Sequence, residues 1–148
     1  MLRKRIQRFH DRFISLKGEP RAIAMGMAVG IFVGVTPTIP FHTALIILFG
    51  LIWKHNLTSA YLGSWLISNP VTIPLFYLGQ YELGKYLLGM NPGGLTLADY
   101  SIRSVFSMGW HVLLPLLTGG LIMAPLFAIP SYFITYRVLL ALRNRNRT

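Results

Sequence analysis

The chain lacks cysteine and is poor in acidic residues: its 148 residues include four Asp and Glu against 14 Lys and Arg. The absence of cysteine excludes disulfides, thiolate metal sites and a Cys nucleophile. The four histidines are scattered and none forms an H-x-x-x-H pair, so no metal site is predicted. No close acid pair and no glycine-rich phosphate loop with lysine occur, and Ser68 with His42 is the one combination that suggests hydrolysis. The sequence therefore favours a protein that is not an enzyme, with no catalytic residue, metal or cofactor.

Charge is missing altogether from three long stretches, residues 22–53, 55–81 and 104–136. Of all residues, 12% are charged and 53% are hydrophobic, and this charged share is about half that of a soluble domain. Apolar runs of this length are typical of membrane segments. We therefore expect membrane lipids to surround most of the chain.

Proline interrupts the first two runs, in the segments Thr36-Pro37-Thr38-Ile39-Pro40 and Ser68-Asn69-Pro70-Val71-Thr72-Ile73-Pro74. Each helical leg beside the first break is about 20 Å long, which is too short for a hydrocarbon core of about 30 Å. The two legs joined end to end would overshoot that thickness. Two interpretations stay open for these runs: a re-entrant hairpin that turns back at the break, or one strongly kinked span.

Positive charge is concentrated at the two ends of the chain. Residues 1–21 hold seven basic and two acidic residues, and residues 137–148 hold four Arg and no acid. Because basic flanks lie on the cytoplasmic side, we expect both termini in the cytoplasm and the chain in a bacterial inner membrane. If every run turned back, Lys54, Lys85 and Arg103 would also be cytoplasmic, which favours hairpins in the first two runs. Nucleic acid is not expected as a partner, because the charges lie at membrane borders.

The first residues predict an amphipathic helix over residues 1–17. Its apolar positions, spaced by three and four residues, are Leu2, Ile6, Phe9, Phe13 and Leu16. Basic side chains occupy the other faces. Such a helix suits the surface of an anionic leaflet, although a solvated helix that only sets topology fits the same pattern.

The sequence as a whole predicts an all-α fold, a polytopic helical membrane protein with proline-broken or re-entrant hairpins. Asn56 is placed to cap a helix over residues 57–67, and Gly89 to end one that starts near residue 71. The last run is expected to be either a hairpin of two short legs or one long kinked helix, broken at Thr118-Gly119-Gly120. After the first helix we expect a single membrane domain over residues 18–148, made of broken units 20–53 and 56–89, a loop 90–95 and a C-terminal helical pair 96–142.

Small residues recur every fourth position in the first run, as Ala22, Gly26, Gly30 and Gly34. They form a flat ridge on one helix face, where another backbone can approach closely. The ridge is suited to packing within the chain, and equally to an interface with a second copy or another membrane protein. Internal packing is slightly favoured.

A set of motifs along the first half of the chain resembles one known family. The pattern joins Glu19-Pro20 and the glycine ridge to Pro37, His42-Thr43, Gly63-x-Trp65 and Ser68-Asn69-Pro70-x-Thr72-x-Pro74. It resembles the DUF2062 family of bacterial membrane proteins from about residue 17 to 84, and more loosely as far as the C-terminal helix. The resemblance implies a small α-helical inner-membrane protein of unassigned function. Some relatives carry this domain beside a glycosyltransferase, which hints at envelope glycolipid or polysaccharide chemistry, although this chain has no such part.

Polar side chains within the apolar runs gather at the two breaks. They are Thr36, Thr38, His42 and Thr43 at the first, and Ser68, Asn69 and Thr72 at the second. Free N–H groups at the start of a broken helix favour anions, and paired interruptions are typical of a transporter's substrate site. We therefore expect transport or lipid handling, with an anion such as a lipid phosphate bound between the breaks.

Less specific interpretations of the same residues stay open. Ser and Thr beside proline often bond freed backbone carbonyls, Asn69 is also suited to a simple helix cap, and a neutral His42 would bond a Thr hydroxyl. Glu82 is placed to pair with Lys85 on one helix, or to accept a proton during coupled transport. The alternative function is a scaffold or assembly subunit that holds a partner, such as a glycosyltransferase, through the glycine ridge.

Overall fold

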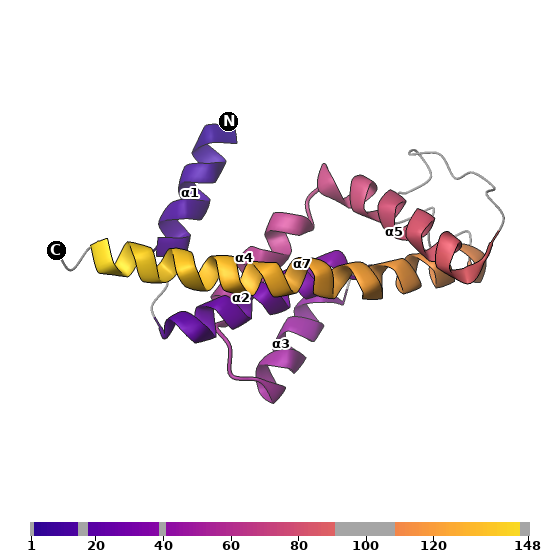
Figure 1. Cartoon of the computed structure of the whole chain (residues 1–148). Helices are drawn as coiled ribbons and strands as arrows, with labels where there is room; N and C mark the ends of the chain where they lie inside the picture. Colours follow the sequence, from indigo (N-terminus) through magenta and orange to yellow (C-terminus); the bar gives the residue numbers. More distant parts are fainter. Residues whose placement is uncertain (1, 15–17, 39–40, 91–108, 146–148) are drawn as a thin grey trace.

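The computed structural model describes residues 2–14, 18–38, 41–90 and 109–145. Within these ranges the chain is all-helical and contains no strand, which confirms the predicted fold class (Figure 1). The expected loop 91–95, the helix start at residues 96–99, Leu16 and Arg103 lie outside the described residues. The helices are α1 (Leu2–Ile14), α2 (Pro20–Val35), α3 (His42–Ile52), α4 (Leu57–Ile67), α5 (Thr72–Leu88) and α7 (Trp110–Arg145).

Local sequence signals set several helix ends. Pro20 occupies the first turn of α2, where its missing N–H is not needed. Asn56 precedes α4, and its side chain accepts a hydrogen bond from the Ser59 N–H at 2.9 Å, as the sequence predicted. Gly89 ends α5 with φ of 65°, a left-handed conformation that glycine adopts at no steric cost.

The glycine ridge of α2 packs within the chain, against the backbone of α4. A Cβ on Gly26 would overlap the Asn56 carbonyl oxygen, and one on Gly30 would overlap that of Ala60. At Gly34 a Cβ would lie 3.1 Å from the Ser64 carbonyl oxygen. Because each step of four residues on α2 matches a step of four on α4, the two helices run parallel in close contact.

The first broken unit doubles back on itself. After α3 the backbone N–H of Asn56 donates to the Ala22 carbonyl at 3.0 Å, so the chain has returned to the start of α2. The sequence left a hairpin and a kinked span open, and residues 20–53 adopt the hairpin shape.

The second broken unit continues in one direction, so the expectation that it would also turn back is wrong. Along α5, Phe76 contacts Phe127 with ring centroids 5.3 Å apart, and Gly84 lies against Pro115. Later residues of α5 thus contact earlier residues of α7, so the two helices are antiparallel. Lys85 therefore lies far from Arg143. Helix α5 continues away from α4 after the break because it packs along α7. The proline pattern does not reveal this packing.

Helix α7 is one continuous helix of 36 residues, about 54 Å long. Of the two interpretations left open for the last run, the single helix therefore holds over residues 110–145, and the hairpin of two short legs does not. The sequence predicted a break at the glycines in the middle of this run. They are instead positions of close approach, because a Cβ on Gly119 would overlap the Gln80 carbonyl oxygen and one on Gly120 would lie 2.5 Å from Pro37 Cδ. Two other elements thus press on the helix where the sequence suggested a turn.

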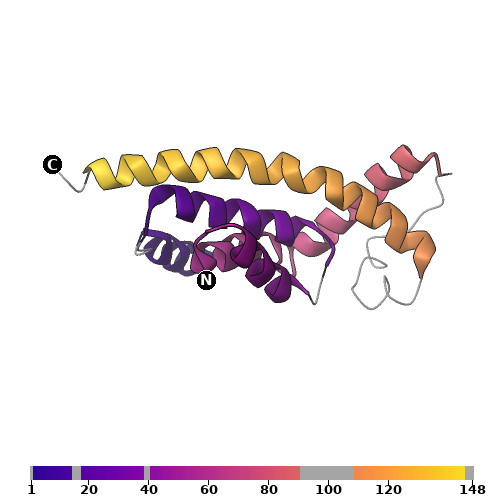
Figure 2. The ribbon, with the colours of Figure 1, turned by 90° about the horizontal axis from the view of Figure 1, so that it is seen from below.

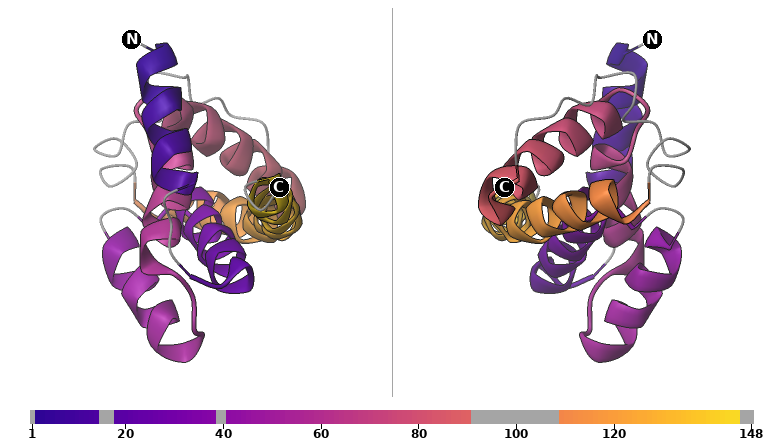
Figure 3. Two further views of the ribbon diagram at one scale, coloured as in Figure 1. Left: turned by 90° about the vertical axis from the view of Figure 1, so that its left-hand side faces the viewer. Right: turned by 90° about the vertical axis from the view of Figure 1, so that its right-hand side faces the viewer.

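The remaining helices are arranged along α7. Helix α5 packs on the N-terminal half of α7, and α2 packs along its middle and C-terminal part (Figure 2). Met27, Ile31 and Val35 share a core with Ala124 near the middle of α7. At the far end, Arg143 Nη2 donates to the Gly18 carbonyl at 2.6 Å. Helix α1 stands out from this body of helices (Figure 3). Among the described helices, α7 is the one that is long and apolar enough to cross a membrane, and α2 and α3 are shorter apolar helices.

We expect Gly30→Ala to destabilise the protein, because the added Cβ would push apart the backbones of α2 and α4. Overpacking of this kind costs about 1–3 kcal/mol. The check is the unfolding temperature of the detergent-purified variant.

Gly79→Ala is the matched control, since a Cβ there would meet only Met123 Cε at 3.9 Å. We expect this variant to unfold at or slightly above the wild-type temperature, because alanine favours a helix interior. Equal losses in both variants would contradict the packing described for the ridge.

Candidate functional site

The two breaks of the chain meet in space. Ser68 Oγ lies 3.3 Å from His42 Nδ1 and also donates to the Gly34 carbonyl at 3.3 Å. His42 starts α3 and Ser68 follows α4, so the contact joins the tip of the hairpin to the kink of the second unit. Three of the polar residues singled out from the sequence, Thr36, His42 and Ser68, therefore form one cluster.

The cluster is built around the carboxyl end of α2. The last carbonyls of a helix lack partners within it, and here side chains supply the missing donors. Thr36 Oγ1 donates to the Phe32 carbonyl at 2.7 Å, and Gln80 Nε2 donates to the Val35 carbonyl. His42 Nε2 lies 3.3 Å from the Thr36 carbonyl oxygen, and because a carbonyl only accepts, Nε2 is the donor. Thr38 Oγ1 lies 3.4 Å from the same oxygen.

The second break satisfies its own backbone. Asn69 Oδ1 accepts hydrogen bonds from the N–H groups of Val71 and Thr72 at 3.1 and 3.2 Å. The Ile73 N–H bonds to the Asn69 carbonyl at 3.0 Å, and Thr72 Oγ1 donates to the Ile67 carbonyl. The N–H groups that an anion would need at the start of α5 are thus engaged within the chain. Thr43, the remaining candidate, is exposed on α3.

Gln80 is a neighbour of the cluster, and the sequence pattern did not single it out. It is fully buried, and it connects α5 to the end of α2. Its Oε1 has no hydrogen-bond partner among the described residues and faces Gly120. The available signal was an amide inside the uncharged run 55–81, because such a group needs a hydrogen-bond partner to be stable there.

The ion pair expected on α5 is present. Lys85 Nζ lies 3.0 Å from Glu82 Oε1, and the Lys85 side chain is nearly buried while that of Glu82 is half exposed. The Lys85 ammonium also lies 4.9 Å from the centre of the Tyr81 ring, a favourable cation–π arrangement. Both contacts join Lys85 to residues of its own helix, so they stabilise the end of α5.

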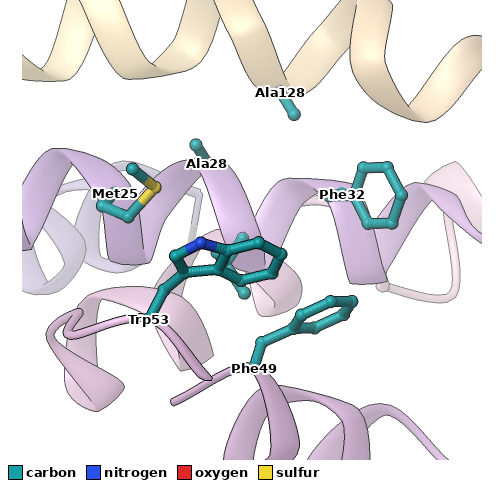
Figure 4. A pocket seen from close by; sticks show the side chains of 7 residues that line it. Met25, Ala28, Phe32, Phe49, Trp53 and Ala128 are labelled. Atoms are coloured by element: carbon teal, nitrogen blue, oxygen red, sulfur yellow. The ribbon is translucent and has the colours of Figure 1, made fainter. Parts of the chain in front are cut away.

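A separate groove of about 360 Å³ opens between α2, α3 and α7 (Figure 4). The small side chains of Ala28 and Ala128 leave the groove unfilled, and aromatic rings line it. The Phe49 ring stacks on the Trp53 ring with centroids 5.6 Å apart and packs edge-on against the Phe32 ring with centroids 6.2 Å apart. No pattern in the sequence marks this groove, because its walls come from distant segments: Ala28 and Ala128 are 100 positions apart. The residues that line it are all apolar: Met25, Ala28, Val29, Phe32, Phe49, Trp53 and Ala128.

The described residues define a small all-helical protein in which two helix breaks are locked together and an apolar groove opens beside them. The chain belongs to the family described as "Uncharacterized protein conserved in bacteria (DUF2062)", whose sequence model matches residues 3–148. The match extends in both directions beyond the motifs noted between residues 17 and 84. No curated protein and no solved structure matches the chain.

We expect Gln80→Leu to destabilise the protein, since it leaves the buried Val35 carbonyl without a donor. A buried polar group that loses its partner costs about 1–3 kcal/mol. Thermal unfolding in detergent measures the loss.

Thr118→Val provides the comparison, because the Thr118 hydroxyl donates to the Leu114 carbonyl of its own helix at 2.8 Å, a bond that adds little to a helix. Its unfolding free energy should change by less than about 0.5 kcal/mol. A Gln80 variant as stable as this control would show that α2 does not depend on the amide.

Proposed function

We propose that this protein is a lipid-handling protein of the bacterial inner membrane and that the groove between α2, α3 and α7 holds an acyl chain. The observation that carries the proposal is the wholly apolar lining of the groove. Sites for polar ligands contain a few placed polar groups that fix orientation. A lining of methyl, thioether and aromatic groups instead matches a hydrocarbon chain. The volume of about 360 Å³ is within the range of ligand pockets.

The exposed surface supports placement in a membrane. Of the helix α3, Ile46 alone is buried, while Ile47, Leu48 and Leu51 are exposed. Soluble proteins rarely expose large contiguous apolar patches, whereas acyl chains cover such a surface at no cost. The exposed apolar residues of α7 include Leu121, Ile122, Leu126, Ile129, Phe133 and Ile134.

The spacing of charges along α7 supports a specific depth. Gly84, next to Lys85, lies against Pro115, and Arg137 follows Pro115 by 22 positions, about 33 Å of helix. No charged residue occurs on α7 between them. This interval matches a hydrocarbon core of about 30 Å. We expect the end with Arg143 to be cytoplasmic and the end with Lys85 to face the opposite side.

The resulting topology has two spans and one hairpin. Helices α4 and α5 would cross together through their kink, α7 would return, and α2 with α3 would enter and leave on the cytoplasmic side. Both termini would then be cytoplasmic. Irregular backbone at Thr36 and Ser68 would be sheltered by protein, which is the condition for its presence at membrane depth.

The hydrogen bonds at the breaks favour lipid handling over transport through them. Thr36, His42 and Ser68 bond backbone carbonyls of α2, and Asn69 caps α5. We therefore assign the cluster a structural role and place the lipid in the groove. The alternative of a scaffold subunit would need a surface other than the glycine ridge, because α4 covers that ridge.

The topology can be tested by thiol labelling, since the chain has no cysteine of its own. Lys54 and Met90 are exposed and lie at opposite ends of the second broken unit. In intact cells with an impermeant maleimide, we expect Met90→Cys to react from outside. Lys54→Cys should react only after the inner membrane is opened. Reaction of both variants from the same side would contradict two crossings.

Filling the groove tests the proposed function. Ala28→Leu adds three carbons to the groove wall and should lower the amount of phospholipid that stays bound in detergent by about tenfold, since a poor steric fit costs 1–3 kcal/mol. Native mass spectrometry of the purified protein measures the bound lipid.

Ala44→Leu adds the same atoms to an exposed position of α3 that does not line the groove. This variant should retain lipid as the wild type does. Equal retention by the wild type and by both variants would refute a lipid site in the groove.

A further inference from the structure

The lining residues at one end of the groove have basic neighbours along their own segments. Met25 and Trp53 lie at this end, away from Phe32 (Figure 4). Arg21 precedes Met25 by one helical turn and so shares its face of α2. Lys54 directly follows Trp53, and both basic side chains are exposed.

A backbone contact brings together the two segments that carry these basic residues. The Asn56 N–H donates to the Ala22 carbonyl at 3.0 Å, which brings the segment containing Lys54 beside the start of α2. Glu19 is the only acid among residues 18–56, against Arg21 and Lys54, so this end carries a net positive charge. Arg143, bonded to the Gly18 carbonyl at 2.6 Å, adds another cation there.

We infer that the groove selects an anionic phospholipid, with its phosphate bound by Arg21 and Lys54 and one acyl chain along the apolar walls. This inference rests on the proposed function and names its substrate class. Arg21 and Lys54 outnumber the single carboxylate of Glu19, and such an excess of positive charge attracts an anion at the surface of a leaflet. Charge-assisted bonds from Arg and Lys suit a phosphate. A zwitterionic headgroup offers the same phosphate but adds an ammonium group, which Arg21 and Lys54 repel.

The test compares two lipids with the same acyl chains, dioleoyl phosphatidylglycerol and dioleoyl phosphatidylcholine. Each is titrated into the full-length protein in detergent, and native mass spectrometry measures the bound fraction. We expect the wild type to bind the glycerol lipid about fivefold more tightly, the range that exposed charge pairs provide. Arg21→Gln with Lys54→Gln should remove this preference while binding of the choline lipid is unchanged. Glycerol phosphate, which has no acyl chain, should displace neither lipid.

A matched control removes the same charge elsewhere. Arg5→Gln with Arg8→Gln neutralises two exposed cations of α1, and the lipid preference should persist in this variant. If this control loses the preference equally, or if Arg21→Gln with Lys54→Gln keeps it, selection by the groove mouth is refuted. If the wild type binds both lipids equally while Ala28→Leu weakens both, the lipid site stands and the headgroup inference falls. If Ala28→Leu changes neither lipid, the proposed function itself fails.

Discussion

The structure depends on satisfying the carboxyl end of α2 inside an apolar body of helices. A helix ends with carbonyl groups that have no partner of their own, and leaving them bare in an apolar setting is costly. Side chains from three other segments reach this end: His42 from α3, Ser68 from the second break and Gln80 from α5. The hairpin, the kink and α5 are therefore positioned by one set of hydrogen bonds.

Glycine is the second constraint, because it decides which backbones approach each other. Gly26 and Gly30 allow α4 to lie parallel to α2 with backbone in contact, and Gly119 allows the backbone of the antiparallel α5 to contact α7. Parallel packing of α2 and α4 requires the intervening α3 to return to the start of α2. The groove is a consequence of this return. Helix α3 buries only Ile46 against the rest of the described structure, and it leaves space beside Ala28 and Ala128.

In this structure, helix packing and the proposed ligand binding depend on different residues, whereas the sequence alone assigned both to the same polar residues. The polar residues at the breaks hold helices together, whereas the apolar groove and its basic mouth offer a place for a ligand. Structural use explains why polar groups are found at the breaks of the uncharged runs: Thr36, Ser68 and Thr72 bond backbone carbonyls at helix ends. A groove without polar atoms gains its binding energy from contact with hydrocarbon.

The sequence determined the elements of this protein by local chemistry. Uncharged runs, Asn56 before α4, Gly89 after α5 and the ridge at Gly30 are signals within a few residues, and each corresponds to an observed helix, end or close contact. The residues Thr36, His42 and Ser68 could be named in advance because polar groups in such runs need partners.

Only the tertiary structure decided the direction of each unit and the location of the hollow surface. The same proline pattern produced a hairpin before Lys54 and a continuing kink before Lys85, since the outcome depends on whether the next helix finds α2 or α7 to pack against. Gly119 and Gly120 looked like a turn because flexibility and close approach demand the same residue. The groove and the partner of Gln80 were beyond prediction, since each joins segments that are distant in the chain.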